Sequence, residues 1–182
     1  MTYYHGTNLL IGKIDLNRSR NRVDFGKGFY LADKFGTARN WAIRKVELEG
    51  EGMPIVIAFE ISPDIFSMHG LRFPSQPGLE WLEFICLNRR VTPMASALTE
   101  PRHDFNWIAG PIADDKVVDV VADYMRGDIN ADLAIDRLRA LPLTHQLSIH
   151  TQAALNYVDE VNVLYRQLKR GHWTQNWIKR KT

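Results

Sequence analysis

The segment DFGKGFYLAD at residues 24–33 constrains the fold of this chain more than any other stretch. Two glycines, Gly26 and Gly28, stand immediately before the aromatic and apolar residues 29–32. Glycine permits a tight turn and a close approach to the backbone, so the segment predicts a turn that leads into a short strand. Neither a dinucleotide-binding glycine fingerprint nor a phosphate-cradling loop is present. Taken alone, the segment favours a hairpin turn followed by a core tyrosine, Tyr30.

Length and composition indicate one domain of ordinary size. The chain has 182 residues, of which 45% are hydrophobic and 24% are charged, and its net charge of +2 is too small to argue for a nucleic-acid partner. Cys86 is the single cysteine, which excludes an internal disulfide framework and fits a reducing compartment. No signal-peptide pattern opens the chain, and no apolar run approaches the roughly 20 residues of a membrane span. We therefore expect a cytoplasmic protein without a membrane partner; a toxin delivered to a target cell would show the same pattern.

Hydrophobic periodicity switches between strand-like and helix-like spacing along the chain, which predicts both strands and helices. Strands are expected at residues 2–5, 29–32, 54–61, 105–109, 146–150 and 155–164, and helices at residues 34–49, 79–87, 114–124 and 131–141. One domain is expected at residues 1–165, with a helical insertion at about 113–142. The basic tail at residues 166–182 contains Trp173 and Trp177. It fits either an amphipathic helix over the core or a charged surface for nucleic acid or an acidic partner.

A second motif, YHGT at residues 4–7, precedes the glycine-rich segment. Together the two motifs resemble the signature of the His-Tyr-Glu class of ADP-ribosyltransferases, which includes the poly-ADP-ribose polymerases and the diphtheria-type toxins. In that class an early strand supplies His and Gly, and a second strand, preceded by Gly-x-Gly, supplies Tyr. The resemblance implies an α+β fold with a split, mostly antiparallel core of two small packed sheets and a cleft between them, and it implies NAD as a substrate.

The resemblance also implies which residues contact NAD. His5 would hydrogen-bond the adenosine ribose, and the backbone of Gly6 would pair with the carboxamide. Tyr30 and Trp41 would flank the nicotinamide, since Trp41 falls where the polymerases carry a second aromatic residue. Nicotinamide is flat and cationic while it is bonded to ribose, so two aromatic faces suit it through stacking and cation–π attraction.

Thr7 and Gly28 belong to the same NAD-binding motifs. Arg18 and Arg20 lie in the loop between the motifs, where either guanidinium would suit the pyrophosphate oxygens; solvated loop arginines fit the pattern almost as well. No metal site is predicted, because the chain has one cysteine and no pair of histidines or carboxylates at ligand spacing.

The third catalytic position of the class, a glutamate, falls on Gln146. Breaking the glycosidic bond of NAD develops positive charge on the ribose, which a carboxylate stabilises. Glutamine can orient the ribose hydroxyl but supplies neither charge nor a base. Three interpretations follow: positioning alone suffices, another carboxylate serves, or the domain binds NAD without turnover. Glu80 and Glu83 are the alternative acids, although an amphipathic helix would hold both in solvent.

A closer resemblance covers about residues 3–155. The chain is similar to a bacterial domain family of unknown function within this fold, through the two motifs above, the segment WLEF at residues 81–84, Asn88-Arg89, the segment GPIADD at residues 110–115 and the late Gln strand. The resemblance implies that Gln146 is a feature of this branch. Such domains occur as effectors and in toxin–antitoxin pairs, so the partner that this kinship implies is an antitoxin protein.

The expected function is therefore mono-ADP-ribosyl transfer from NAD to a macromolecular acceptor, protein or nucleic acid, with His5, Tyr30 and Gln146 as catalytic residues. Two alternatives stay open. One is an NAD glycohydrolase, in which water is the acceptor. The other is a catalytically silent module that binds NAD or a protein partner.

Overall fold

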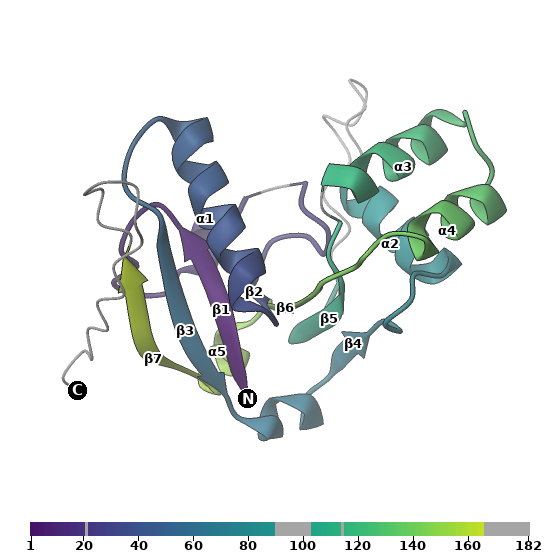
Figure 1. Cartoon of the computed structure of the whole chain (residues 1–182). Coiled ribbons are helices and arrows are strands. Elements are labelled where there is room, and N and C mark those ends of the chain that lie inside the picture. The colour runs from purple at the N-terminus through teal and green to yellow at the C-terminus, as the bar shows by residue number, and fades with distance from the viewer. Residues whose placement is uncertain (21, 90–102, 114, 166–182) are drawn as a thin grey trace.

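The computed structural model describes residues 1–20, 22–89, 103–113 and 115–165, and the expected α+β class is confirmed (Figure 1). The strands are β1 (Thr2–Thr7), β2 (Phe29–Ala32), β3 (Ile55–Ile61), β4 (Gly70–Arg72), β5 (Trp107–Pro111), β6 (His145–Ile149) and β7 (Val158–Tyr165). The helices are α1 (Phe35–Glu49), α2 (Leu79–Arg89), α3 (Asp115–Arg126), α4 (Ala131–Arg139) and α5 (Gln152–Leu155), with short 3-10 turns at Leu16–Arg18 and Pro63–Ser67.

All seven strands are hydrogen-bonded into one sheet in the order β4-β5-β6-β2-β1-β3-β7, whereas two separate small sheets were expected. Only β4 and β5 run parallel; the other neighbours are antiparallel. Strand β2 pairs with β6 along its whole length, but it meets β1 at a single position, Tyr4 opposite Ala32. The sheet therefore almost divides between β1 and β2, and that one bridge joins its two halves.

Two groups of helices cover the same face of the sheet, and β2 lies at the boundary between them. Tyr30 and Ala32 are two residues apart on β2, so their side chains share one face. Ala32 packs with Ala38 and Ala42 of α1, whereas Tyr30 packs against the cluster formed by α2, α3 and α4. In Figure 1, α1 lies over β1 and β3, and α2, α3 and α4 form a separate lobe beside β5.

The opposite face carries the largest apolar cluster. Leu31, Ile57, Phe59 and Leu147 alternate with the residues of the helix-covered face and are buried there. This cluster connects the two halves of the sheet on the face opposite the helices, because it contains residues from strands on both sides of the β1–β2 boundary.

The expected helical insertion at about 113–142 corresponds to α3 and α4, which pack on α2. Strand β1 runs two residues further than expected, β5 and β7 begin later, and β4 was not predicted. The expectations for the tail at 166–182 lie outside the described residues. No helix within the described ranges is long and apolar enough to cross a membrane.

Candidate functional site

His5 lies at the point where β1 and β2 stop pairing. Its Nδ1 is 2.8 Å from the carbonyl oxygen of Tyr30, and its ring stacks on Phe29 with a centroid distance of 4.6 Å. A carbonyl oxygen only accepts, so Nδ1 carries the hydrogen. Burial lowers the pKa of His5 to about 4. The hydrogen bond to Tyr30 acts to raise the pKa, and the positive charge of Lys45 acts to lower it. The ring is therefore neutral at pH 7, and Nε2 presents a lone pair.

Gly6 is required by helix α1. A Cβ at Gly6 would overlap the carbonyl oxygen of Ala38, so any side chain would push α1 away from the sheet. Strand β1 pairs with β3 from Thr2 to Thr7 but with β2 only at Tyr4, so within the described chain the edge of β1 beyond Tyr4 has no partner strand. Thr7 is buried, and its hydroxyl forms hydrogen bonds with the backbone of Leu9.

Tyr30 fastens the glycine turn that precedes it. Its hydroxyl donates to the carbonyl oxygen of Gly26 at 2.6 Å and accepts from the amide of Phe25 at 3.0 Å. Gly26 has a φ of +77°, a conformation that favours glycine. The hydroxyl of Tyr30 thus fixes the glycine turn that precedes β2, and the ring of Tyr30 is half-buried.

Gly28 is fixed from two sides. Its amide donates to Ser19 Oγ at 2.8 Å, and a Cβ at this position would lie 2.8 Å from Cε1 of His150. His150 Nδ1 is 2.7 Å from the carbonyl oxygen of Lys27, and its Nε2 is 2.7 Å from Ser148 Oγ. Burial lowers the pKa of His150 to about 4, so the ring is neutral and binds the turn through its Nδ1 hydrogen.

His103 also contacts this turn, since its Nε2 is 3.1 Å from the carbonyl oxygen of Phe25 and its ring meets that of His150 edge-on. Among the described residues, no group of three or more potential metal ligands occurs.

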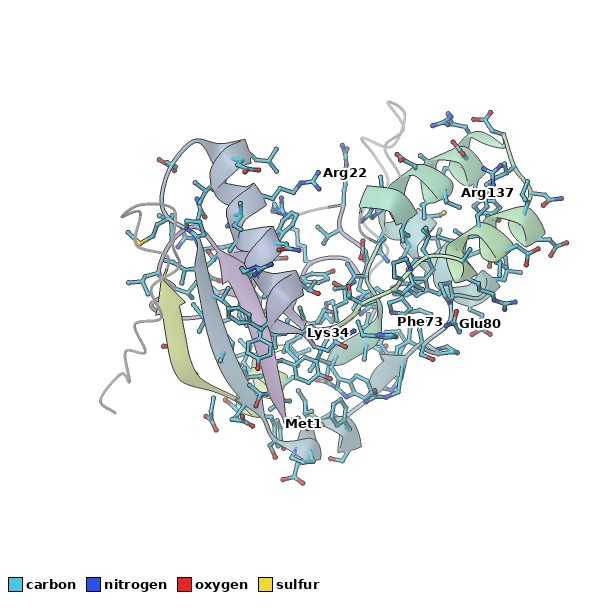
Figure 2. The ribbon with its side chains drawn as sticks, in the orientation of Figure 1. Met1, Arg22, Lys34, Phe73, Glu80 and Arg137 are labelled. Atoms are coloured by element: carbon cyan, nitrogen blue, oxygen red, sulfur yellow. The ribbon has the colours of Figure 1, made fainter. Side chains whose placement is uncertain are left out.

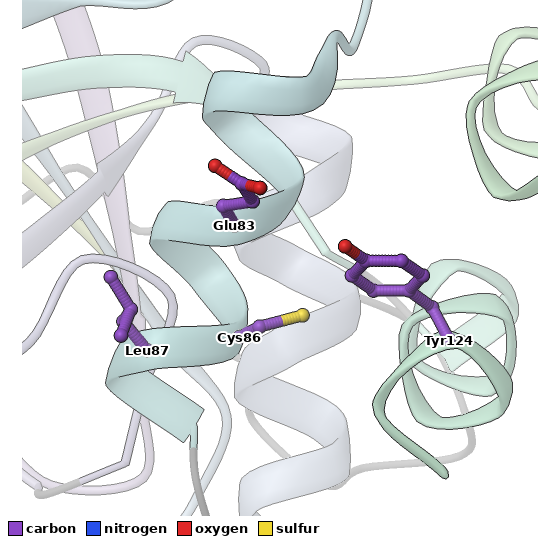
Figure 3. A pocket seen from close by; sticks show the side chains of 4 residues that line it. All are labelled: Glu83, Cys86, Leu87 and Tyr124. Carbon is purple, nitrogen blue, oxygen red and sulfur yellow. The ribbon is translucent and has the colours of Figure 1, made fainter. Parts of the chain in front are cut away.

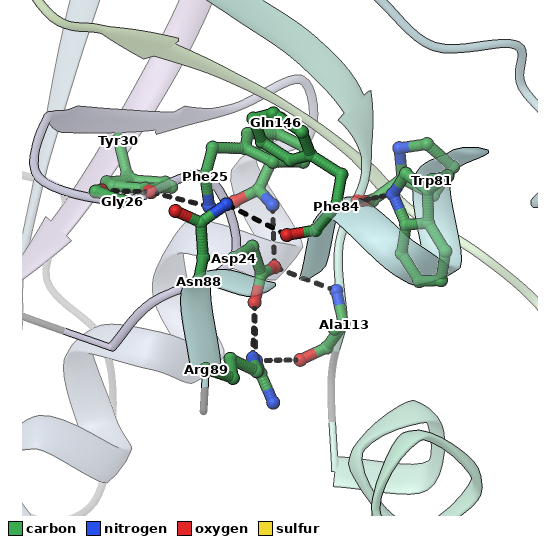
Figure 4. Close-up of polar contacts among 11 residues, drawn as sticks. Asp24, Phe25, Gly26, Tyr30, Trp81, Phe84, Asn88, Arg89, Ala113 and Gln146 are labelled. Carbon is green, nitrogen blue, oxygen red and sulfur yellow. Dashed lines mark hydrogen bonds and ion pairs between the residues drawn. The ribbon is translucent and has the colours of Figure 1, made fainter. Parts of the chain in front are cut away.

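Gln146 is bound to a carboxylate that the sequence reasoning did not single out. Its Nε2 donates to Asp24 Oδ2 at 2.7 Å, and only 7% of Gln146 and 5% of Asp24 are exposed. Asp24 Oδ2 also accepts from the amide of Ala113 at 3.0 Å, while Oδ1 accepts from Arg89, whose Nε is 2.9 Å away (Figure 4). The turn before β2, strand β6, helix α2 and the segment after β5 thus meet at one buried ion pair.

The residues of this network lie in segments whose sequence motifs were recognisable but indicated no function for these residues. Asp24 opens the glycine-rich segment, and Arg89 and Ala113 fall in the features shared with the bacterial family. Local sequence patterns do not encode contacts between residues this far apart in the chain, so these contacts could not be predicted although the segments were recognised.

Trp41 faces a cation in the structure. The guanidinium carbon of Arg20 lies 4.8 Å from the centroid of the Trp41 ring, a cation–π distance. Trp41 comes from α1 and Arg20 from the loop before β2, so the pair spans the same boundary as His5 and Tyr30. The structure shows no ring contact between Trp41 and Tyr30 among the described aromatic pairs. Arg18 is exposed at the end of its 3-10 turn.

The alternative acids on α2 lie away from Gln146. Glu80 is exposed on the outside of the helical lobe (Figure 2), and Glu83 lines a pocket of about 240 Å³ with Cys86, Leu87 and Tyr124 (Figure 3). With 3.6 residues per turn, Glu83 is roughly 140° around the helix from Asn88, which faces the glycine turn. The carboxylate that contacts Gln146 is therefore Asp24.

A family model described as "Protein of unknown function (DUF3990)" matches residues 1–159. No curated protein and no solved structure matches the chain. Because the match covers most of its length, the chain belongs to the DUF3990 family.

Proposed function

We propose that this member of the DUF3990 family is an NAD-dependent mono-ADP-ribosyltransferase, which releases nicotinamide and transfers ADP-ribose to a macromolecular acceptor. The observation that carries the proposal is the divergence of β1 and β2, adjacent strands that supply His5 and Tyr30 and pair at only one position. The finer fold assignment, a split core of the ADP-ribosyltransferase type, is part of the same proposal, and the near division of the sheet at this boundary supports it.

The residues near the point where β1 and β2 stop pairing suit the chemistry of NAD. The lone pair on Nε2 of the neutral His5 would accept a hydrogen bond from a ribose hydroxyl. The unpaired edge of β1 at Gly6 offers backbone groups to a carboxamide. Trp41 already holds a guanidinium over its ring, so this ring face accepts a cation such as the nicotinamide ring of intact NAD.

The reaction would break the bond between nicotinamide and the ribose and leave both electrons on nicotinamide, which departs neutral. The ribose carbon gains positive character, and a lone pair on the acceptor forms the new bond as the acceptor loses a proton. Tyr30 and Trp41 would flank the leaving ring, and Gln146 would hold a ribose hydroxyl. Within this proposal the acceptor is a protein or a nucleic acid, the reaction takes place in the cytoplasm, and an antitoxin protein is the expected partner if the activity is toxic.

Incubation with adenine-labelled NAD in the presence of a bacterial extract tests the proposal. Transfer predicts free nicotinamide and label on a macromolecule, and His5→Ala and Tyr30→Ala should each abolish both. Tyr124→Ala and His69→Ala are the matched controls, because Tyr124 lines the pocket between α2 and α3 and His69 is exposed beside β4.

Three results would point elsewhere. Free ADP-ribose without labelled macromolecule would identify a glycohydrolase. Tight binding of NAD that stays intact would identify a binding module, and the absence of both binding and cleavage would refute the proposal.

A further inference from the structure

We infer that Asp24 is a positioning residue that orients the side-chain amide of Gln146, so that Oε1 serves as the hydrogen-bond acceptor that a carboxylate oxygen would otherwise provide. The nature of the ligand that Oε1 receives rests on the proposed function. The orientation of the amide rests on the contacts of Asp24 alone.

The carboxylate of Asp24 is held rigidly. It is almost completely buried, and each of its oxygens accepts a hydrogen bond. Oδ1 accepts from the guanidinium of Arg89, and Oδ2 accepts from the backbone amide of Ala113. Arg89 Nη2 also donates to the carbonyl oxygen of Ala113 at 3.0 Å, so the guanidinium cannot turn without losing a second bond. A carboxylate that accepts from a guanidinium and from a backbone amide is held in one position.

The carboxylate of Asp24 decides which way the amide of Gln146 lies. The nitrogen and oxygen of a glutamine amide have similar shapes, and only the hydrogen-bond partners distinguish them. An ionised carboxylate accepts and cannot donate, so the atom 2.7 Å from Asp24 Oδ2 is Nε2. Oε1 must therefore point away from Asp24.

Oε1 receives no hydrogen bond from another described side chain. The bond to Asp24 is the only side-chain hydrogen bond that Gln146 makes within the described residues. Oε1 also differs from Oδ1 of Asn88, which is sealed from solvent without a partner. The negative charge beside Nε2 polarises the amide and increases electron density on Oε1, which strengthens it as an acceptor.

The same contact explains why residue 146 is a glutamine. A glutamate here would bring a second carboxylate within about 3 Å of Asp24, and two carboxylates at that distance cannot both stay ionised, so the pKa of one rises strongly. Asp24 and Gln146 therefore form a matched pair that supplies one carboxylate and one acceptor oxygen, Oε1, that points away from it.

The inference predicts that Gln146→Glu alone does not improve nicotinamide release, because the new carboxyl group faces Asp24. Asp24→Asn should lower kcat about tenfold or more and leave the KM for NAD within about twofold, since a charged hydrogen bond to the positioned amide is lost. The reciprocal double variant Asp24→Asn/Gln146→Glu should recover part of the loss, because the amide introduced at position 24 then donates to the carboxylate introduced at position 146. Asp33→Asn is the matched control, since Asp33 accepts from the amide of His145 at the other end of β2.

A measurement that is independent of turnover is the pair of side-chain amide proton signals of Gln146 in an NMR spectrum of the full chain. We expect one proton to be shifted downfield and to exchange slowly in the wild type, and Asp24→Asn to abolish both features while Asp33→Asn leaves them intact. Signals that are unchanged in Asp24→Asn, or a Gln146→Glu variant that is faster than wild type, would overturn the inference. A wild type that neither binds nor cleaves NAD would refute the proposed function, and the amide signals would still decide the orientation of Gln146.

Discussion

Acidification is expected to destabilise the folded chain through His5. The ordinary pKa of histidine is 6.5, and burial lowers that of His5 to about 4 in the folded chain. Between these values the unfolded chain binds the proton and the folded chain does not, so the free energy of unfolding falls as the pH falls. The contribution of His5 is fully present above about pH 6.5 and is lost progressively down to about pH 4.

The two pKa values set the size of the effect. Each pKa unit corresponds to about 1.4 kcal/mol, which gives an upper value of about 3 kcal/mol for His5. The residue as a whole is not completely buried, and the remaining contact with solvent reduces this value, so we expect about 2 kcal/mol. Carboxylates also titrate in this range, so the informative quantity is the difference between wild type and His5→Gln, which retains a donor for the carbonyl oxygen of Tyr30.

Urea unfolding, followed by tryptophan fluorescence at a series of pH values, measures this difference. Between about pH 7.5 and about pH 4.5 the wild type should lose about 2 kcal/mol more than His5→Gln, with a slope of at most about 1.4 kcal/mol per pH unit. His69→Gln should follow the wild type, because His69 is exposed. Parallel curves for wild type and His5→Gln, or a wild type that gains stability relative to the variant on acidification, would refute the assignment of a neutral His5.

Three further substitutions test the packing and the nicotinamide pocket. Gly6→Ala should lower the free energy of unfolding by about 3 kcal/mol, because the new Cβ meets the backbone of Ala38. The control Gly36→Ala, at an open position of α1, should raise it by up to about 1 kcal/mol. Equal effects of the two substitutions in urea unfolding would contradict the contact between Gly6 and α1. Tyr30→Phe should cost about 1–2 kcal/mol in the same assay, since two backbone groups of the glycine turn lose their partner, and an unchanged midpoint would contradict this. Trp41→Leu should weaken NAD binding by about 1 kcal/mol, roughly fivefold, in calorimetric titration; unchanged affinity would remove Trp41 from the pocket.

Much of the fold was predictable where the sequence carries a clean local pattern. The helix α1 and the strands β2 and β3 were expected within one or two residues, because their apolar residues recur at regular spacing or follow glycines. Strand β4 was not, since three residues carry no period. Its formation depends on Gly70, where any side chain would overlap the ring of Trp107 on the neighbouring strand.

The connection of the two sheet halves was also beyond local reasoning. Whether β1 and β2 separate completely depends on a single bridge between Tyr4 and Ala32, and no residue pattern encodes one register pair. The family resemblance implied two sheets, and the hydrogen bonds show a single sheet with a narrow junction.

The candidate site shows the same division between local and long-range information. The motifs identified His5, Tyr30 and Gln146, but not the contacts that define their chemistry. Asp24 and Gln146 are 122 positions apart, and their bond depends on how the helical lobe presents Arg89. Gly6 was interpreted as a point of close approach for a ligand, and the structure adds that helix α1 requires it.

A crystal structure of the chain with an NAD analogue, in which carbon replaces the ribose ring oxygen and prevents cleavage, tests the central claim most directly. We expect the nicotinamide between Tyr30 and Trp41, its carboxamide on the edge of β1 at Gly6, and a ribose hydroxyl within hydrogen-bond distance of Gln146 Oε1. An analogue bound away from the divergence of β1 and β2, or a saturated soak with no analogue bound, would contradict this proposal.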